Sequence, residues 1–175
     1  MITPNHLSIL GIIHTAISII ALLAAFYGLY RSGRIDPATG PGRLYIWLTI
    51  FTCLTAFPIM KTGHFTPGHY VAIIILILLP LGIYVRQLRI FGKLADYVQV
   101  IFLSTTLFLS LIPAIVETLT RLPISHPIAD GPNDPILQKG LSALALLYFV
   151  GVIYQIIKLR ARRRKSPLPV NSAVS

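Results

Sequence analysis

Charged residues are scarce in this chain, and acidic residues are the scarcest of them. Only 11% of the 175 residues are charged and only five are Asp or Glu, whereas a typical soluble domain has about 25% charged residues. Hydrophobic residues make up 55% of the chain. This composition excludes an ordinary soluble globular domain and predicts an integral membrane protein with a single helical domain.

Cysteine and the common catalytic motifs are also missing. The single cysteine, Cys53, excludes a disulfide within the chain. The sequence has no Gly-x-Ser-x-Gly element, no phosphate-cradling glycine loop and no paired acidic metal motif, so the enzyme classes built on these motifs are not indicated. Pro58, Pro80 and Pro113 are the only hints of the broken helices that small transporters use, and a transporter is therefore the third hypothesis.

What the chain does have is hydrophobic stretches of membrane-spanning length. A helix needs about 20 apolar residues to cross a hydrocarbon core of about 30 Å. The pattern predicts an all-α fold, an integral membrane five-helix bundle over residues 1–165, followed by a disordered tail at 166–175. The third stretch is aliphatic almost throughout and is expected to be the most lipid-exposed. The five stretches are Leu7–Tyr30, Leu44–Met60, Tyr70–Val85, Tyr97–Leu119 and Leu141–Ile157.

The net charge of +10 is distributed unevenly between the two sides of the predicted bundle. Twelve of the 15 Lys and Arg residues fall between spans one and two, between spans three and four, or after span five; the exceptions are Lys61, Arg121 and Lys139. Because cationic loops stay in the cytoplasm, we expect the N-terminus outside and the C-terminus inside a bacterial inner membrane. The Arg-rich end then contacts anionic lipid, and nucleic acid is not an expected partner.

All five histidines fall on the predicted outer side of the membrane. In span one, small residues and His14 recur at intervals of three and four, which predicts a seam that faces the bundle. A similar polar seam in span four ends at Glu117. The sequence therefore predicts an outer-leaflet His/Glu cluster. The histidines are His6, His14, His64, His69 and His126.

Several kinds of site are compatible with this cluster. Imidazole is a common metal ligand, so His14 with His69 or His64 is a candidate pair for haem b, and a metal ion would use three or four of these histidines, His126 and Glu117. A quinone or lipid-headgroup pocket is a further hypothesis, and such a protein would belong to a redox or assembly complex with other membrane subunits. The alternative is a non-catalytic membrane subunit or scaffold with structural histidines, in which Glu117 pairs with Arg121 four residues later.

Three short motifs in the first half of the chain carry a resemblance to known sequences. The runs are His14-Thr-Ala…Leu22-Leu-Ala, Gly42-Arg-Leu-Tyr45 and Gly63-His-Phe-Thr-Pro67. They resemble a group of uncharacterised bacterial multi-pass membrane proteins with a histidine in the first helix and a Gly-Arg-Leu-Tyr-like start to the second. The chain differs in having Thr39-Gly-Pro41 where that group often has a His-Arg pair. The resemblance implies an architecture but no reaction. A second, general likeness is to small b-type cytochromes, which hold haem between helix histidines.

Overall fold

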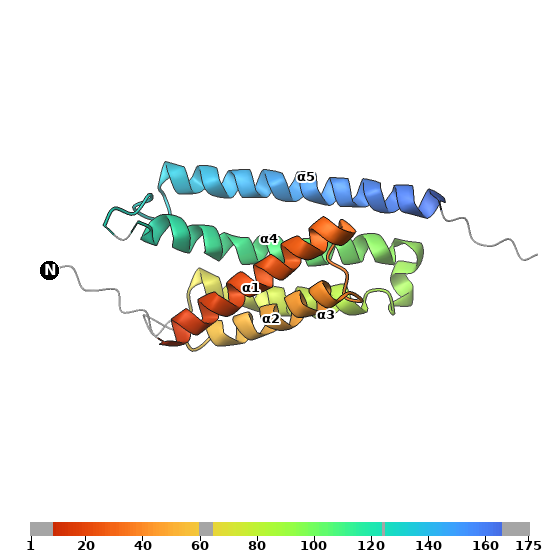
Figure 1. The fold of residues 1–175 in the computed structure, drawn as a ribbon, viewed down its shortest axis with the longest axis horizontal. Coiled ribbons are helices and arrows are strands. Elements are labelled where there is room, and N and C mark those ends of the chain that lie inside the picture. Colours follow the sequence, from red (N-terminus) through yellow and green to blue (C-terminus); the bar gives the residue numbers. More distant parts are fainter. Residues whose placement is uncertain (1–8, 60–64, 124, 166–175) are drawn as a thin grey trace, which may run out of the picture.

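The computed structural model describes residues 9–59, 65–123 and 125–165, and this part of the chain is helical, without strands. The five α-helices of the described residues run roughly along one long axis (Figure 1). Their bounds, together with a short 3-10 helix, η1, are α1 Ile9–Ser32, α2 Gly40–Ala56, α3 Pro67–Tyr84, η1 Arg89–Leu94, α4 Ala95–Arg121 and α5 Pro135–Lys165. The predicted tail at 166–175 lies outside the described residues.

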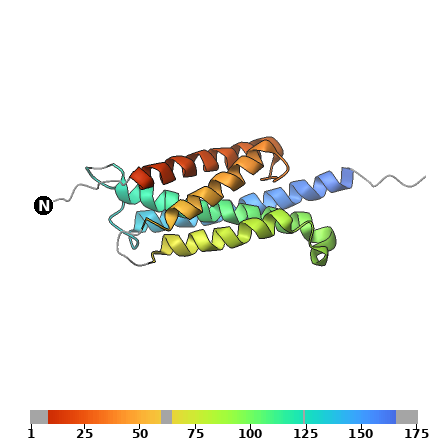
Figure 2. The same cartoon turned by 90° about the horizontal axis from the view of Figure 1, so that it is seen from below.

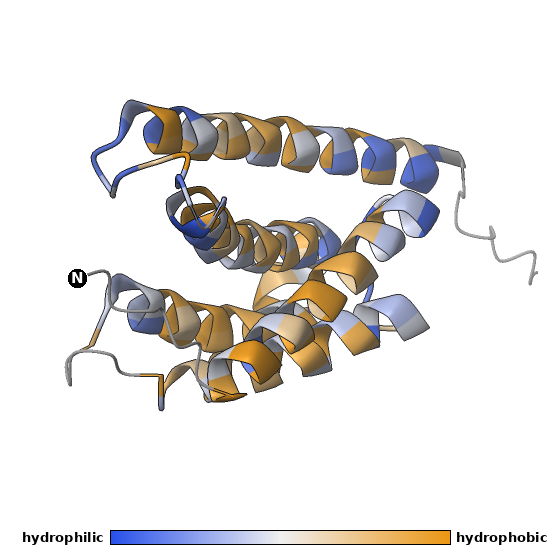
Figure 3. Cartoon of the chain, turned by 60° about the vertical axis from the view of Figure 1, so that its left-hand side comes forward, coloured by the Kyte–Doolittle hydropathy of each residue, from blue (hydrophilic) through white to orange (hydrophobic). Residues whose placement is uncertain are grey.

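Four of the helices are long and apolar enough to cross a membrane: α1, α3, α4 together with η1, and α5. The prediction of a helical, multi-pass membrane protein is confirmed at this level. The second hydrophobic stretch forms α2, which has 17 residues and therefore covers only about 25 Å at 1.5 Å per residue. Figure 3 shows hydrophobic residues along the middle of the helices and hydrophilic residues gathered towards their ends, as expected of a protein surrounded by lipid.

Each helix packs mainly against its neighbours in sequence. α1 contacts α2, α2 contacts α3, α3 contacts α4 and α4 contacts α5, and a smaller contact joins α1 to α4. The seam predicted in α1 faces this interior, because Ala21, Ala25 and Gly28 are all buried. Ala21 and Ala25 share a core with Tyr45 and Cys53 of α2. Small residues here allow the two helices to approach closely.

α5 is the most exposed helix. The prediction that the third stretch would be the most lipid-exposed helix is therefore wrong. Only 11% of the apolar window of α5 is buried, against 28% of that of α3. α5 lies along α4 at the outside of the bundle (Figure 1), and its Arg163 also donates to the Lys93 carbonyl of η1. α3 packs between α2 and α4 and buries Ala72, Ile75 and Leu79. A uniformly aliphatic helix has no polar face, so its sequence does not show how much of its surface packs against other helices.

Polar side chains of α4 bind the helices on either side of it. The Tyr45 hydroxyl of α2 lies 2.9 Å from the Thr106 hydroxyl, and both side chains are buried. The Gln99 amide nitrogen donates to the Gly82 carbonyl of α3 over 2.9 Å. Such bonds between helices favour association in lipid, where apolar contacts alone give little preference for one neighbour over another.

The attachment of α5 to α4 is likewise polar. Ser104 and Gln155 exchange hydrogen bonds of 3.1 and 3.3 Å through their side chains. The Thr105 hydroxyl lies 2.8 Å from the hydroxyl of Tyr148. These two pairs fix the register of α5, which has few other buried contacts.

The turn between α1 and α2 is held by local bonds. Gly33 has φ +71° and donates its N–H to the Leu29 carbonyl over 2.7 Å, a helix ending that only glycine adopts readily. Asp36 pairs with Arg34 and accepts the Ala38 N–H. Partial burial opposes ionisation of Asp36, but these hydrogen bonds and the guanidinium outweigh it and lower the pKa of the carboxyl below its usual range.

α2 begins directly after this turn, where the backbone comes into close contact. The Thr39 hydroxyl accepts the Gly42 N–H over 3.2 Å and caps the helix. It also donates to the Asp36 carbonyl over 2.8 Å. A Cβ at Gly42 would lie 1.9 Å from that same carbonyl oxygen, so the turn requires glycine at this position.

The alternating direction of the helices separates two ends of the bundle. We call the end formed by the C-termini of α1, α3 and α5 the basic end, and the opposite end the histidine end (Figure 2). At the basic end, Asp96 binds both Arg86 and Arg163. Exposed tyrosines gather near the same end, in the pattern of an interfacial aromatic belt: Tyr27, Tyr30, Tyr84 and Tyr154. Which end faces the cytoplasm stays a prediction.

Candidate functional site

His14 is half-buried on the seam of α1 and binds α2. Its Nδ1 lies 3.0 Å from Oγ1 of Thr55. The Thr55 hydroxyl donates its own proton to the Phe51 carbonyl over 2.9 Å, so its oxygen accepts from His14. The hydrogen-bond network therefore assigns the proton of neutral His14 to Nδ1 and leaves the lone pair on Nε2.

His69 is buried in the first turn of α3, with 3% of its surface exposed. Its Nδ1 accepts the backbone N–H of Thr66 over 3.0 Å and lies 2.8 Å from the Thr66 hydroxyl. This is a capping box in which histidine stands where Glu or Gln is usual. Because a backbone N–H only donates, neutral His69 carries its proton on Nε2.

The Nε2–H of His69 is the one histidine donor in the described residues that is buried without a hydrogen-bond partner. Two aromatic rings flank the imidazole. The Phe65 ring lies edge-on with centroids 5.3 Å apart, and the Phe57 ring is tilted at 6.1 Å. Buried polar groups are normally paired, so this N–H is the clearest unsatisfied group at the histidine end.

Glu117 lies at the exposed end of the polar seam of α4 and pairs with Arg121, 2.5 Å away and four residues later. About half of the Glu117 side chain is exposed. It makes neither a hydrogen bond nor an ion pair with a histidine among the described residues, and acts on His14 only as a charge at a distance. The seam is buried at Gln99, Leu103 and Thr106 but opens to the outside before it reaches Glu117.

An exposed i, i+4 ion pair contributes little to stability. We expect Glu117→Gln to change the apparent free energy of unfolding by no more than about 0.5 kcal/mol. Thermal unfolding of the protein in detergent, followed by circular dichroism at two salt concentrations, measures this. A loss of several kcal/mol would mean that Glu117 has a partner other than Arg121.

Two members of the predicted cluster contact the end of the same helix. His14 and His69 both meet the C-terminal end of α2, His14 through Thr55 and His69 through Phe57, two residues further on. Glu117 remains apart. His126 is exposed in the loop before α5, where its backbone N–H bonds to the Pro123 carbonyl. His6 and His64 lie outside the described residues.

The two histidines differ in what they offer a ligand. A metal-binding histidine usually donates one ring N–H to an acceptor and coordinates through the other nitrogen. His14 has this arrangement, with Nδ1–H on Thr55 and a lone pair on Nε2. His69 has the reverse, since the Thr66 N–H occupies its Nδ1 lone pair. Among the described residues no group of three or more His, Cys, Asp or Glu side chains is placed to hold a metal ion.

Comparison with known proteins found no matching family model, no similar curated protein and no similar solved structure. Fold and function rest on the chain itself. The resemblance to the bacterial membrane-protein group and the likeness to small b-type cytochromes thus stay predictions. The evidence for the site is the geometry of the described residues.

The sequence analysis did not predict the two threonines that bind the histidines, Thr66 and Thr55. Thr66 precedes His69 by three residues, the spacing of a capping box, so this signal was present although histidine replaces the usual Glu or Gln. Thr55 gave no such signal. It lies 41 positions from His14, and only the packing of α1 on α2 brings the two side chains together.

Proposed function

We propose that this chain is a non-catalytic subunit or scaffold of a bacterial inner membrane, with its N-terminus outside. Its histidines hold helix ends in place. The observation that carries the proposal is that three members of the predicted cluster each bind a partner close at hand: His14 binds Thr55, His69 binds Thr66 and Glu117 binds Arg121. None of these three side chains binds either of the other two.

The donor chemistry also favours a structural role over bis-histidine haem ligation. Coordination through Nε2 of His69 would require that nitrogen to lose its proton and the Nδ1 to become a donor. The partly buried Thr66 N–H would then lose its acceptor, and a donor left unpaired in this way costs about 1–3 kcal/mol when water cannot reach it. A structural His69 avoids this cost.

The visible absorption spectrum of gently purified protein tests the proposal. We expect a colourless sample, unchanged on reduction by dithionite, and no stoichiometric metal by elemental analysis. A Soret band that sharpens on reduction would establish haem ligation instead. Loss of that band in His14→Ala, with retention in His126→Ala, would then identify the ligand.

A second candidate function follows from the unpaired Nε2–H of His69. A quinone carbonyl is an acceptor of the kind that this donor lacks, and the flanking Phe57 and Phe65 rings are apolar surfaces on which a quinone ring packs. His14, with its Nε2 lone pair at the same end of α2, would accept a proton from the reduced form.

Thermal unfolding with a short-chain quinone separates the two functions. A scaffold shows the same unfolding temperature with and without quinone. A quinone-binding protein is stabilised as RT ln(1 + [L]/Kd), about 2.7 kcal/mol at 100 Kd, and this gain disappears in His69→Leu, which has no donor. His126→Leu is the matched control, because it removes an exposed histidine from the same end.

A further inference from the structure

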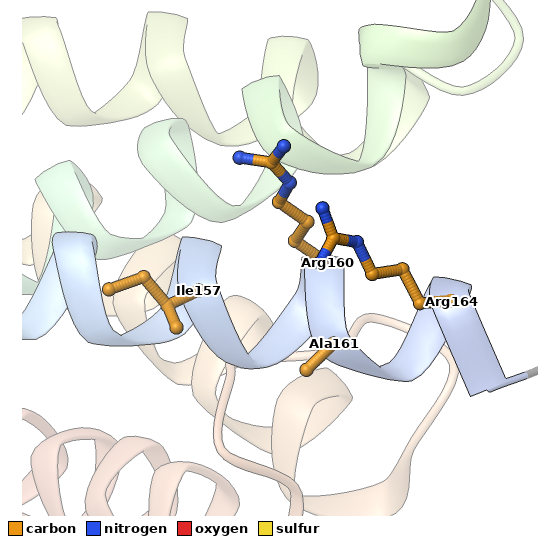
Figure 4. Close-up of a pocket in the computed structure, with 4 residues that line it drawn as sticks. All are labelled: Ile157, Arg160, Ala161 and Arg164. Atoms are coloured by element: carbon orange, nitrogen blue, oxygen red, sulfur yellow. The ribbon is translucent and has the colours of Figure 1, made fainter.

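A groove at the basic end has features of a lipid-headgroup site. It is a shallow, open groove with a volume of about 420 Å³ along the last turns of α5. Arg160 and Arg164 line it together with the apolar side chains of Ile157 and Ala161. Figure 4 shows both arginine side chains leaving α5 on the same side.

These two arginines have no acidic partner in the part of the chain that the structure describes, whereas Arg34, Arg86 and Arg163 do. Arg163 binds Asp96 and lies over the Tyr97 ring, and Arg34 binds Asp36. Both acids of this end are thereby occupied. Arg160 and Arg164, four residues apart on one helix face, are left with ten guanidinium N–H donors and no anion.

An exposed tyrosine just before the groove predicts that the groove lies at the depth of lipid phosphates. Tyr154 is exposed one turn before Ile157, and tyrosines of this kind sit at the boundary between hydrocarbon and headgroups. Ile157 and Ile153 are also exposed, by 62% and 57%, and lie four residues apart. They make an apolar strip that leads from the groove towards the membrane interior, and the arginines follow it by about one and two turns.

We propose that this groove binds the headgroup of an anionic phospholipid. The phosphate lies between the guanidinium groups of Arg160 and Arg164, whose planar forks suit bidentate phosphate binding. One acyl chain lies along Ile157 and Ile153. The apolar strip is the reason for choosing a lipid over free phosphate as the occupant, because a soluble anion gains nothing from it.

The test compares two double variants that remove the same charge. Purified protein in neutral detergent is titrated with dioctanoyl phosphatidylglycerol, and the bound lipid is counted by native mass spectrometry. We expect Arg160→Gln/Arg164→Gln to weaken binding by at least about tenfold. The matched control, Arg43→Gln/Arg89→Gln, removes two exposed arginines of the same end and should change binding by less than about twofold.

Three results would overturn the proposal. Equal weakening in both double variants would show attraction by net charge alone. Equal affinity for dioctanoyl phosphatidylcholine would show that the anion is not recognised. Equal competition by glycerol phosphate would show a free-phosphate site without a lipid contribution. Circular dichroism of both variants checks that they fold, and the four substituted side chains are all exposed. Arg160→Lys/Arg164→Lys, which keeps the charge without the planar fork, is expected to bind with intermediate affinity.

Discussion

Gly42→Ala is expected to destabilise the protein by about 3 kcal/mol or more, which corresponds to a fall of roughly 6–12 °C in the unfolding temperature for a chain of this size. A Cβ at this position would lie 1.9 Å from the Asp36 carbonyl oxygen and 2.6 Å from its carbon. These are backbone atoms, so no side-chain rotation relieves the contact.

The turn cannot move aside without losing its own bonds. The Asp36 carbonyl accepts both the N–H and the hydroxyl of Thr39, over 3.0 and 2.8 Å, and the Asp36 carboxylate binds Arg34. Displacing Asp36 would therefore also loosen the cap of α2. Thermal unfolding in detergent, monitored by circular dichroism, measures the effect.

Gly40→Ala is the matched control for this prediction. It makes the same chemical change two residues earlier in the same helix turn, but no atom lies within 4 Å of the added Cβ. Because alanine is the better helix former, we expect the stability of this variant to be unchanged or slightly higher. If both variants lose the same stability, the close contact at Asp36 is not the cause.

The second large effect is expected at His69. His69→Leu places an apolar side chain at this buried position and removes the acceptor of the Thr66 N–H. Leaving this group unpaired costs about 2 kcal/mol, or roughly 4–8 °C in unfolding temperature. The measurement is again thermal unfolding in detergent without added ligand.

His69→Gln distinguishes a cap from a ligand. Glutamine at the third helix position is a usual member of the capping box, so it should restore at least about half of the lost stability. Its amide does not replace imidazole as a haem or metal ligand. A Gln variant as unstable as the Leu variant would contradict the capping role. His126→Leu, in an exposed loop, should change stability by less than about 0.5 kcal/mol.

The sequence was sufficient to predict the helices, because their signal is local. Apolar length and the small-residue seam of α1 predicted both a membrane helix and its inward face, and Ala21, Ala25 and Gly28 are buried as expected. The predicted ends of the helices were less accurate. α5 extends from Pro135 to Lys165, beyond the predicted Leu141–Ile157, because Asp134 accepts the Ile136 N–H over 2.7 Å and caps the helix early.

The candidate site was harder to predict, because it depends on which helices meet. The seams of α1 and α4 share a spacing, but α1 lies mainly against α2 and only slightly against α4. His14 consequently meets Thr55 instead of Glu117. Glu117 is placed beyond the buried part of its seam and pairs within its own helix. Periodicity gives the inward face of a helix but not the partner on that side.

The order of helix contacts has a consequence for biosynthesis. Nearly every helix pair in the described bundle is also consecutive in the chain, with only the smaller α1–α4 contact between non-neighbours. During translation, each helix after α1 therefore finds a packing partner in the helix made just before it. Local contacts of this kind close short loops and favour fast assembly. α5, which docks mainly on α4 through Ser104 and Thr105, can join last without rearranging the helices that precede it.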